Sequence, residues 1–279
     1  MKTETASGFA DLGSHQIFYK IAGTGPRLMI ITGTNSDTRH TPTIYDAPGS
    51  ENFELLNFDH RGMGQSGSTE VPPEMEDYAD DIARLLDHLG WEDTAVVGVS
   101  FGGMVAQHFA LRYPNRVKRL ALCCTSSGGD GGASYPLHTL LDMTAEEYAR
   151  FIMKKMNTKH TDEWQAKHPV KAKATYEFFL RGADQNFGDR ERFKALKNQF
   201  MARSRHNTYD KLHLLSMPVL VAAGVDDGVA PPENAEAMAE AIPNAELKIF
   251  RGGHLFMKED PKAWPYLFKF LSGAESSDG

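Results

Sequence analysis

The feature that most constrains the fold is a serine flanked by glycines, in the sequence Gly-Val-Ser-Phe-Gly at residues 98–102. Residues 94–97 before it are short, apolar and β-branched, which is typical of a buried strand. Residues 104–111 after it have helical spacing and few helix breakers. The pattern predicts a nucleophile elbow, in which Ser100 takes strained backbone angles and its hydroxyl stands above a sheet. The alternative is an ordinary strand-to-helix turn.

Strand-like and helical segments alternate along most of the chain. The predicted strands are residues 15–21, 28–31, 53–58, 94–97, 117–122, 218–223 and 247–250. The predicted helices are residues 78–89, 104–111, 232–241 and 262–271. This alternation implies right-handed crossovers and a mostly parallel sheet, which is an α/β fold with helices flanking the sheet.

The stretch from residue 126 to residue 210 breaks this alternation. Residues 128–132 are four glycines around one aspartate, and this composition predicts a flexible linker. The remainder has no strand-like runs and predicts helices at residues 145–156, 162–167, 171–181 and 189–204. We therefore expect a core domain of residues 1–125 and 211–279, with a helical lid (cap) domain of residues 126–210 inserted between two strands.

A serine hydroxyl needs a base within hydrogen-bond reach, and the base needs an acceptor that orients it. In a parallel sheet these groups come from loops at the carboxyl ends of strands. Among eleven histidines, His254 lies just past a late predicted strand, after two glycines that allow a sharp turn. His40, in the loop after residues 28–31, is a second histidine to consider. The acid is either Asp226 or Asp227, which follow the predicted strand 218–223.

Acyl transfer also needs donors for the negative charge that develops on the carbonyl oxygen. The Phe101 amide opens the predicted elbow helix, where the helix dipole favours negative charge. The loop after residues 28–31 offers the second donor, for which we predict the Thr34 amide, with Gly33 allowing close approach. An ordinary glycine turn is the alternative.

These motifs together resemble the α/β-hydrolase superfamily over nearly the whole chain. The glycine loop at residues 32–34, the turn Asp-His-Arg-Gly-Met-Gly-Gln-Ser at residues 59–66, the elbow and the two late loops occur in the family's order. In that family the acid stands three residues after a strand-end glycine and four before a proline, which here are Gly224 and Pro231. The resemblance therefore implies Asp227 as the acid, and a triad of Ser100, Asp227 and His254. Family members often carry histidine where this chain has Thr32.

Within the superfamily, the chain is similar to enol-lactone hydrolases and small serine carboxylesterases with a helical lid. The resemblance implies a serine hydrolase that cleaves a small ester or lactone through an acyl-enzyme. Carbon–carbon bond hydrolysis and cofactor-free haloperoxidase or perhydrolase chemistry use the same triad and are alternatives. A small-molecule sensor with little turnover is an alternative from another class. We expect no cofactor and no metal site.

The predicted lid carries several arginines, among them Arg150, Arg181, Arg203 and Arg205. A guanidinium binds a carboxylate in a charge-assisted, bidentate manner, so one of them could hold a carboxylate-bearing substrate. For each of them, a solvated position on the surface is the alternative.

Composition limits the partners. A formal net charge of −7 argues against nucleic acid or an anionic membrane. We find no signal peptide pattern and no apolar run long enough to span a membrane. Cys123 and Cys124 are neighbours, so a disulfide between them would be strained. These features predict a cytoplasmic protein that acts on a small molecule, and leave monomer and homodimer open.

Overall fold

The computed structural model describes residues 6–39 and 43–273, in which eight strands form one sheet. The strand order is β1-β2-β4-β3-β5-β6-β7-β8. The strands are β1 (Ala6–Asp11), β2 (Gln16–Ala22), β3 (Arg27–Ile31), β4 (Glu54–Phe58), β5 (Thr94–Val99), β6 (Val117–Cys123), β7 (Val219–Gly224) and β8 (Glu246–Phe250). The pairs β1–β2 and β2–β4 are antiparallel, and every other pair is parallel. The predicted α/β fold with a mostly parallel sheet is confirmed.

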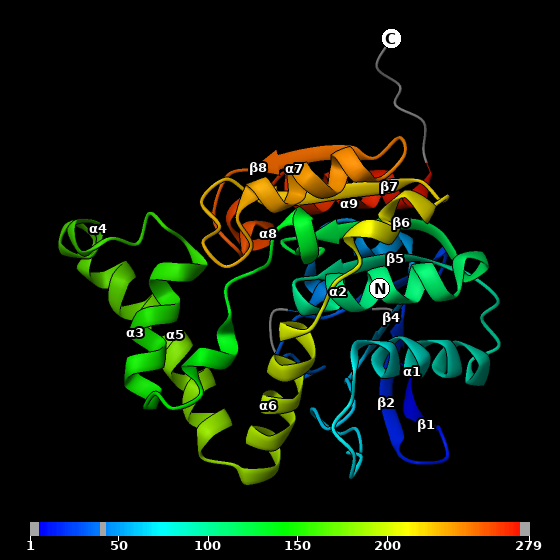
Figure 1. Cartoon of the computed structure of the whole chain (residues 1–279), viewed down its shortest axis with the longest axis horizontal. Coiled ribbons are helices and arrows are strands. Elements are labelled where there is room, and N and C mark those ends of the chain that lie inside the picture. The colour runs from blue at the N-terminus through cyan, green and yellow to red at the C-terminus, as the bar shows by residue number, and fades with distance from the viewer. Residues whose placement is uncertain (1–5, 40–42, 274–279) are drawn as a thin grey trace.

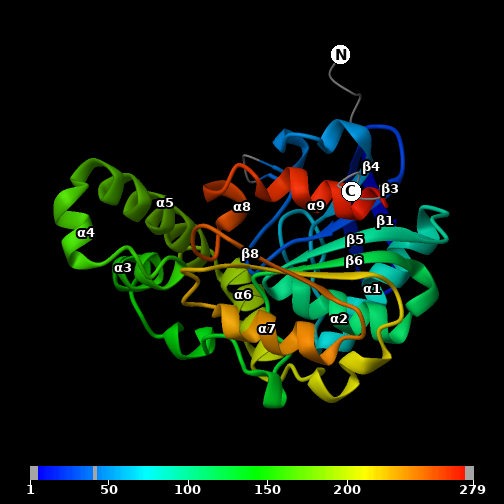
Figure 2. The same ribbon diagram turned by 90° about the horizontal axis from the view of Figure 1, so that it is seen from above.

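Helices cover both faces of this sheet. The α-helices are α1 (Met75–His88), α2 (Phe101–Arg112), α3 (Ala145–Met156), α4 (Asp162–Lys167), α5 (Pro169–Phe187), α6 (Arg190–Ser204), α7 (Pro232–Ala241), α8 (Phe256–Glu259) and α9 (Ala263–Ser272). The 3₁₀ helices are η1 (Ile44–Asp46), η2 (Ser50–Asn52), η3 (Pro114–Arg116), η4 (Gly129–Gly131), η5 (Leu137–Leu140) and η6 (Tyr209–Leu214). Figure 2 shows α1, α2 and α7 on one side of the sheet and α9 on the other. Each side has its own buried apolar cluster. No helix in the described part of the chain is long and apolar enough to cross a membrane.

The central strands are buried along nearly their whole length. Every residue of β7 is buried, and β5 and β3 are each buried except at one end residue. A parallel sheet with helices on both faces selects such continuous apolar runs, which is why the sequence revealed these strands. The first strand, β1, was not predicted. It pairs with β2 alone at the edge of the sheet, and most of its side chains are exposed, so its residues lack that apolar signal.

Residues 126–210, which we call the helical insertion, leave the sheet after β6 and return at β7. Figure 1 shows α3, α4 and α5 to one side of the sheet, with α6 between them and the core. The side chains of Thr144, Thr161 and Asp189 accept backbone hydrogen bonds at the starts of α3, α4 and α6. Helix α5 runs beyond the predicted end at residue 181, through Gly182. Its last turns are held by tertiary packing that buries Ala183 and Asn186.

The glycine segment at residues 128–132 is not a flexible linker, so that prediction is wrong. The Gly128 amide donates to the Gly132 carbonyl at 3.1 Å, and the segment forms the turn η4. It packs against the end of the helical insertion, because a Cβ on Gly128 would lie 2.1 Å from the His206 carbonyl oxygen. A Cβ on Gly131 would lie 2.2 Å from the Tyr209 ring. The glycines serve close packing rather than flexibility.

Candidate active site

Ser100 lies in the sharp turn between β5 and α2, with φ 56° and ψ −118°. Positive φ is strained for a residue with a side chain, and such strain gathers at functional sites. The turn is held from both sides, because the Ser100 amide donates to the Cys123 carbonyl and the Ser100 carbonyl accepts from Thr125 Oγ1, both at 2.8 Å. The strained turn predicted from the glycine spacing is therefore present.

The glycines around Ser100 stand where no side chain fits. A Cβ on Gly98 would lie 2.6 Å from the Gly102 carbonyl oxygen. A Cβ on Gly102 would lie 2.0 Å from the Ile31 carbonyl oxygen, which belongs to the neighbouring strand β3. The two glycines let α2 start directly beside the sheet, and this places the serine at the sheet's carboxyl edge.

The structure brings Ser100, His254 and Asp227 into one hydrogen-bonded row. His254 Nε2 lies 2.9 Å from Ser100 Oγ, and His254 Nδ1 lies 2.7 Å from Asp227 Oδ2. A carboxylate oxygen only accepts, so the Nδ1–H donates to Asp227 and Nε2 is left to accept the serine proton. All three residues are buried, with exposed fractions of 8% for Ser100, 4% for His254 and 3% for Asp227.

Of the two adjacent acids, Asp227 rather than Asp226 points at the histidine. Its second oxygen, Oδ1, accepts from the Val229 and Ala230 amides at 2.8 and 2.9 Å, which fixes the carboxylate in its loop. Asp226 instead forms an ion pair with Lys159 at 2.7 Å. Adjacent side chains diverge, so only one of the pair can reach His254.

The helical insertion helps to hold the histidine loop. The His254 amide donates to the carbonyl oxygen of Met156, the last residue of α3, at 2.6 Å. A Cβ on Gly253 would lie 2.0 Å from the same oxygen, so the glycine is needed for this approach. Asn157 Nδ2 also donates to Glu259 Oε2 at 2.7 Å, beyond the histidine loop.

The loop after β3 passes directly over Ser100. A Cβ on Gly33 would lie 3.4 Å from Ser100 Cβ, which is the close approach that the sequence predicted for this glycine. Among the described residues, neither the Thr34 nor the Phe101 amide donates to a protein acceptor. Two free amides that flank the serine can stabilise an oxyanion.

His60 is hydrogen-bonded to the start of this loop, at Thr32. It is 1% exposed, and its Nε2 lies 3.0 Å from the Thr32 carbonyl oxygen. Burial lowers the pKa of His60 to about 4, so the ring is neutral and donates a hydrogen bond through Nε2–H. No role for His60 was predicted from the sequence. Its contact with the residue before Gly33 makes it a support of the site, which becomes visible only when residues 32 and 60 are seen side by side.

The turn at residues 59–66, which we call the brace, connects strand β2 with the loop after β3 through hydrogen bonds. Asp59 accepts from the Thr38 amide at 2.6 Å and from the Gln65 amide at 2.8 Å, and Ser66 Oγ accepts from the Phe18 amide at 2.9 Å. The Asp59 contact ties the turn to the far end of the loop that contains Gly33.

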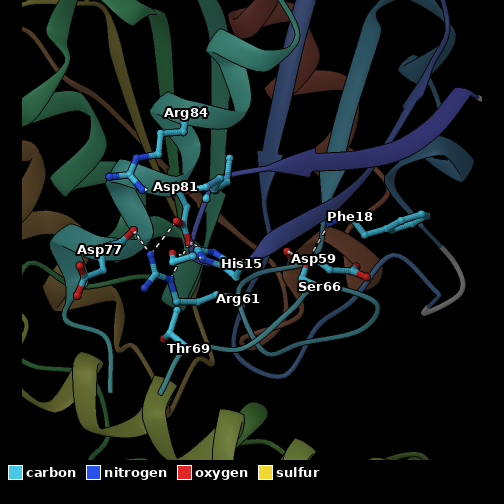
Figure 3. A network of polar contacts seen from close by, with 12 residues as sticks. His15, Phe18, Asp59, Arg61, Ser66, Thr69, Asp77, Asp81 and Arg84 are labelled. Carbon is cyan, nitrogen blue, oxygen red and sulfur yellow. Dashed lines mark hydrogen bonds and ion pairs between the residues drawn. The ribbon is translucent and has the colours of Figure 1, made fainter. Parts of the chain in front are cut away.

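Figure 3 shows this brace continuing through Arg61 into a buried ion pair. Arg61 binds Asp81 through two hydrogen bonds of 2.7 Å, and His15 Nε2 lies 3.2 Å from the same carboxylate. Burial opposes ionisation of Asp81, but the hydrogen bonds from His15 and Arg61 outweigh burial and lower its pKa. The turn is therefore fixed to α1, which carries Asp81.

The sequence also singled out two cysteines, His40 and several arginines. Cys123 and Cys124 are free, buried thiols whose pKa is raised by burial, so neither is suited to act as a nucleophile. His40 lies outside the described residues. Arg150, Arg181 and Arg205 are exposed, whereas Arg203 is buried. Within residues 6–39 and 43–273, no group of three or more His, Cys, Asp or Glu side chains could hold a metal ion.

The sequence of this chain is similar to those of known hydrolases. The family model described as alpha/beta hydrolase fold matches residues 42–261. A poly(3-hydroxyalkanoate) depolymerase of Ectopseudomonas oleovorans is 30% identical over 227 residues, which cover 78% of this chain and 75% of the depolymerase. A putative carbamate hydrolase RutD of Caulobacter sp. (strain K31) is 29% identical over 225 residues, covering 79% of this chain and 81% of that protein.

Solved structures show the same fold. The enol-lactonase from Burkholderia xenovorans LB400 superposes with a TM-score of 0.75 at 20% identity, over 95% of this chain and 100% of that chain. The resemblance to enol-lactone hydrolases noted from the sequence is therefore matched in three dimensions at the level of the fold.

Proposed function

The chain belongs to the alpha/beta hydrolase family, and from this membership and the hydrogen-bonded row we propose that it is a serine hydrolase of small esters or lactones. The observation that carries the proposal is the contact of His254 with Ser100 Oγ at 2.9 Å and with Asp227 at 2.7 Å. In this proposal Ser100 is the nucleophile, His254 the general base and acid, and Asp227 the group that orients the histidine and stabilises its cation.

In the first half-reaction, Ser100 Oγ attacks the carbonyl carbon while His254 Nε2 takes the serine proton. The carbonyl π electrons move onto oxygen, and the Phe101 and Thr34 amides hold the resulting oxyanion. The oxyanion then re-forms the carbonyl and the bond to the leaving oxygen breaks. His254 gives its proton to that oxygen, so an ester releases an alcohol, and a lactone opens to a hydroxyacyl-enzyme.

In the second half-reaction, water attacks the acyl-enzyme while His254 takes one of its protons. The tetrahedral intermediate releases the carboxylic acid, and the proton returns from His254 to Ser100 Oγ. No external oxidant or reductant is needed. In this proposal residues 126–210 act as the lid domain over a core of residues 1–125 and 211–279. The hydrogen bond from the His254 amide to the Met156 carbonyl supports the role of residues 126–210 as a lid, because it joins the helical insertion to the site.

The proposal is tested with a panel of p-nitrophenyl esters, simple lactones and an aryl carbamate, the last because one relative is named a putative carbamate hydrolase. We expect Ser100→Ala to lower kcat/KM by about 10⁴-fold or more, and Asp227→Asn by on the order of 10⁴-fold. Asp226→Asn is the matched control, because this neighbouring acid pairs with Lys159, and it should change kcat/KM by less than about 3-fold.

Circular dichroism and melting temperature establish that each variant is folded. Turnover in Ser100→Ala equal to that of the wild type would reject the mechanism. Ligand-dependent thermal stabilisation with no turnover of any substrate by the wild type would instead favour a sensor.

A further inference from the structure

Arg203, near the end of α6, is a buried cation without an acidic partner. It is 6% exposed, and its guanidinium donates to Ser134 Oγ at 2.6 Å and to Thr34 Oγ1 at 3.4 Å. Both acceptors are neutral hydroxyls, and among the described residues no carboxylate lies within ion-pair distance of it. Its neighbour Arg205, by contrast, is exposed and forms a fork-like pair with Glu74 at 2.9 Å.

A guanidinium buried with no carboxylate in contact is unfavourable, because burial removes water and only the more distant Tyr148 and Asp227 oppose the resulting fall in its pKa. Burial lowers the pKa of Arg203, but only to about 10, so the group stays charged at neutral pH. Three of its five N–H groups have no acceptor in the described chain. Such a cation is suited to an anion that arrives from outside.

The position of Arg203 connects it to two of the loops that form the site. Thr34 follows Gly33, which lies against Ser100. Ser134 precedes Tyr135, whose amide donates to the Val229 carbonyl at 2.7 Å in the loop that fixes Asp227. The guanidinium therefore contacts the loop that contains Gly33 directly, through Thr34, and is connected to the loop of Asp227 through Ser134 and Tyr135.

Gln199 provides an independent sign of a ligand. It lies one turn before Arg203 on the same side of α6 and is 0% exposed. Its Oε1 accepts from the Asn35 amide at 2.9 Å, which fixes the orientation of the side-chain amide. Its Nε2 has no hydrogen-bond partner within the described chain. Both side chains therefore present unused donors on the same side of α6, and one anion with several acceptor oxygens could satisfy both.

We propose that Arg203 and Gln199 form a subsite for a carboxylate of the substrate, so that the enzyme acts on esters or lactones that carry a second, free carboxylate. Arg203 supplies the charge and a paired set of donors, and Gln199 supplies a further donor. The inference rests on the proposed hydrolase function and narrows its substrate class.

The experiment compares mono-p-nitrophenyl glutarate with p-nitrophenyl pentanoate, a neutral ester of the same chain length. We expect the wild type to favour the anionic ester in kcat/KM by about 10-fold or more. Arg203→Met should lower kcat/KM for the anionic ester by about 10- to 100-fold, mainly through KM, and change the neutral ester far less. Arg203→Lys should recover part of the loss. Arg205→Met is the matched control, since it removes an arginine two residues away that already has a partner, and it should leave both rates unchanged.

A second readout needs no catalysis. Glutarate should raise the melting temperature of Ser100→Ala saturably, and the rise should disappear in the double variant with Arg203→Met. If Ser100 proves dispensable for hydrolysis while glutarate still binds through Arg203, the proposed function fails and the subsite stands. If neutral esters are cleaved in a Ser100-dependent way but the anionic ester is not preferred and glutarate has no effect, the subsite is overturned and the hydrolase stands.

Discussion

Burial sets the protonation state of two histidines of this protein, His60 and His206. His60 and His206 are enclosed, and burial lowers the pKa of His60 to about 4 and that of His206 to about 3. His206 Nε2–H donates to the Ser126 carbonyl oxygen at 3.0 Å, so the Nδ1 of this neutral ring accepts from His108 Nε2 at 3.1 Å. Both rings are built into the fold as neutral hydrogen-bonding groups. His254 differs, because each of its ring nitrogens faces a group that takes part in the proposed reaction.

The state of His60 predicts how stability depends on pH. In the unfolded chain its pKa is about 6.5, so as pH falls the unfolded state takes up a proton before the folded state does. The contribution of His60 is fully present above about pH 6.5, and it is lost as pH falls toward about 4, with a total on the order of 3 kcal/mol. Urea unfolding across this range should show that the free energy of unfolding decreases as the pH is lowered.

His60→Gln should flatten that dependence, because glutamine keeps a donor for the Thr32 carbonyl and does not titrate. The remaining slope is expected from His206, whose pKa is lowered in the same direction. His213→Gln, at an exposed position, is the control and should leave the slope as it is in the wild type. Equal slopes in the wild type and His60→Gln would contradict the prediction.

At the scale of elements, the strand–turn–helix unit of β5 and α2 sets the position of the nucleophile. Helix α2 is buried over almost its whole length, unlike α1, which has one apolar face. It packs on the sheet through Gly102 and Gly103, whose missing side chains leave room for β3 and for Thr125. The serine is thus held by the packing of the whole unit and not by its own side-chain contacts.

Gly102→Ala should therefore destabilise the protein by about 3 kcal/mol or more, because its Cβ would meet the Ile31 carbonyl oxygen at 2.0 Å and the backbone of β3 cannot move without disturbing the sheet. Gly182→Ala is the matched control. Its Cβ would meet nothing within 4 Å in the middle of α5, and it should stabilise by about 0.5–1 kcal/mol. Chemical denaturation measures both. A Gly102→Ala protein as stable as the wild type would show that the turn tolerates a side chain.

For the molecule as a whole, the helical insertion docks on the core at several places, and one of them is a group of polar contacts around α6. Arg192, in the first turn of α6, donates to Asp37 at 3.1 Å and to Asn186 Oδ1 at 2.7 Å. The side chains of Arg192 and Asp37 are 14% and 1% exposed, so solvent screens this pair much less than a surface pair. Gln199 adds its contact with Asn35 two turns further along.

Arg192→Met should lower the free energy of unfolding by about 1–3 kcal/mol, since Asp37 loses a buried charged partner while keeping Arg39. It should also speed cleavage by chymotrypsin within residues 126–210 before the core is cut. Arg112→Met removes an exposed pair with Asp80 and should cost less than about 1 kcal/mol, with no change in cleavage. Equal effects of the two variants would show that the Arg192 contact does not hold the insertion.

The sequence by itself determined the features whose causes lie within a few neighbouring residues. Buried parallel strands require continuous apolar runs, the elbow requires glycines on both sides of Ser100, and strand-end loops must carry His254 and the adjacent acids. These are local requirements, so the order of elements, the sheet type, Ser100 and His254 could be predicted, and the acid was limited to Asp226 or Asp227. The choice of Asp227 came from the resemblance to the α/β-hydrolase superfamily. Edge strand β1 could not be predicted, because a mostly exposed strand does not require a continuous apolar run.

Only the tertiary structure decided which side chains lose water and which partners they then find. The glycines at residues 128–132 are packed because residues 206–209 lie against them, and α5 passes through Gly182 because Ala183 and Asn186 are buried. Arg203 and Arg205 are two residues apart and identical in sequence terms, yet one is enclosed beside Thr34 and the other pairs with Glu74 at the surface. Desolvation depends on segments that are distant along the chain, and no local pattern encodes it.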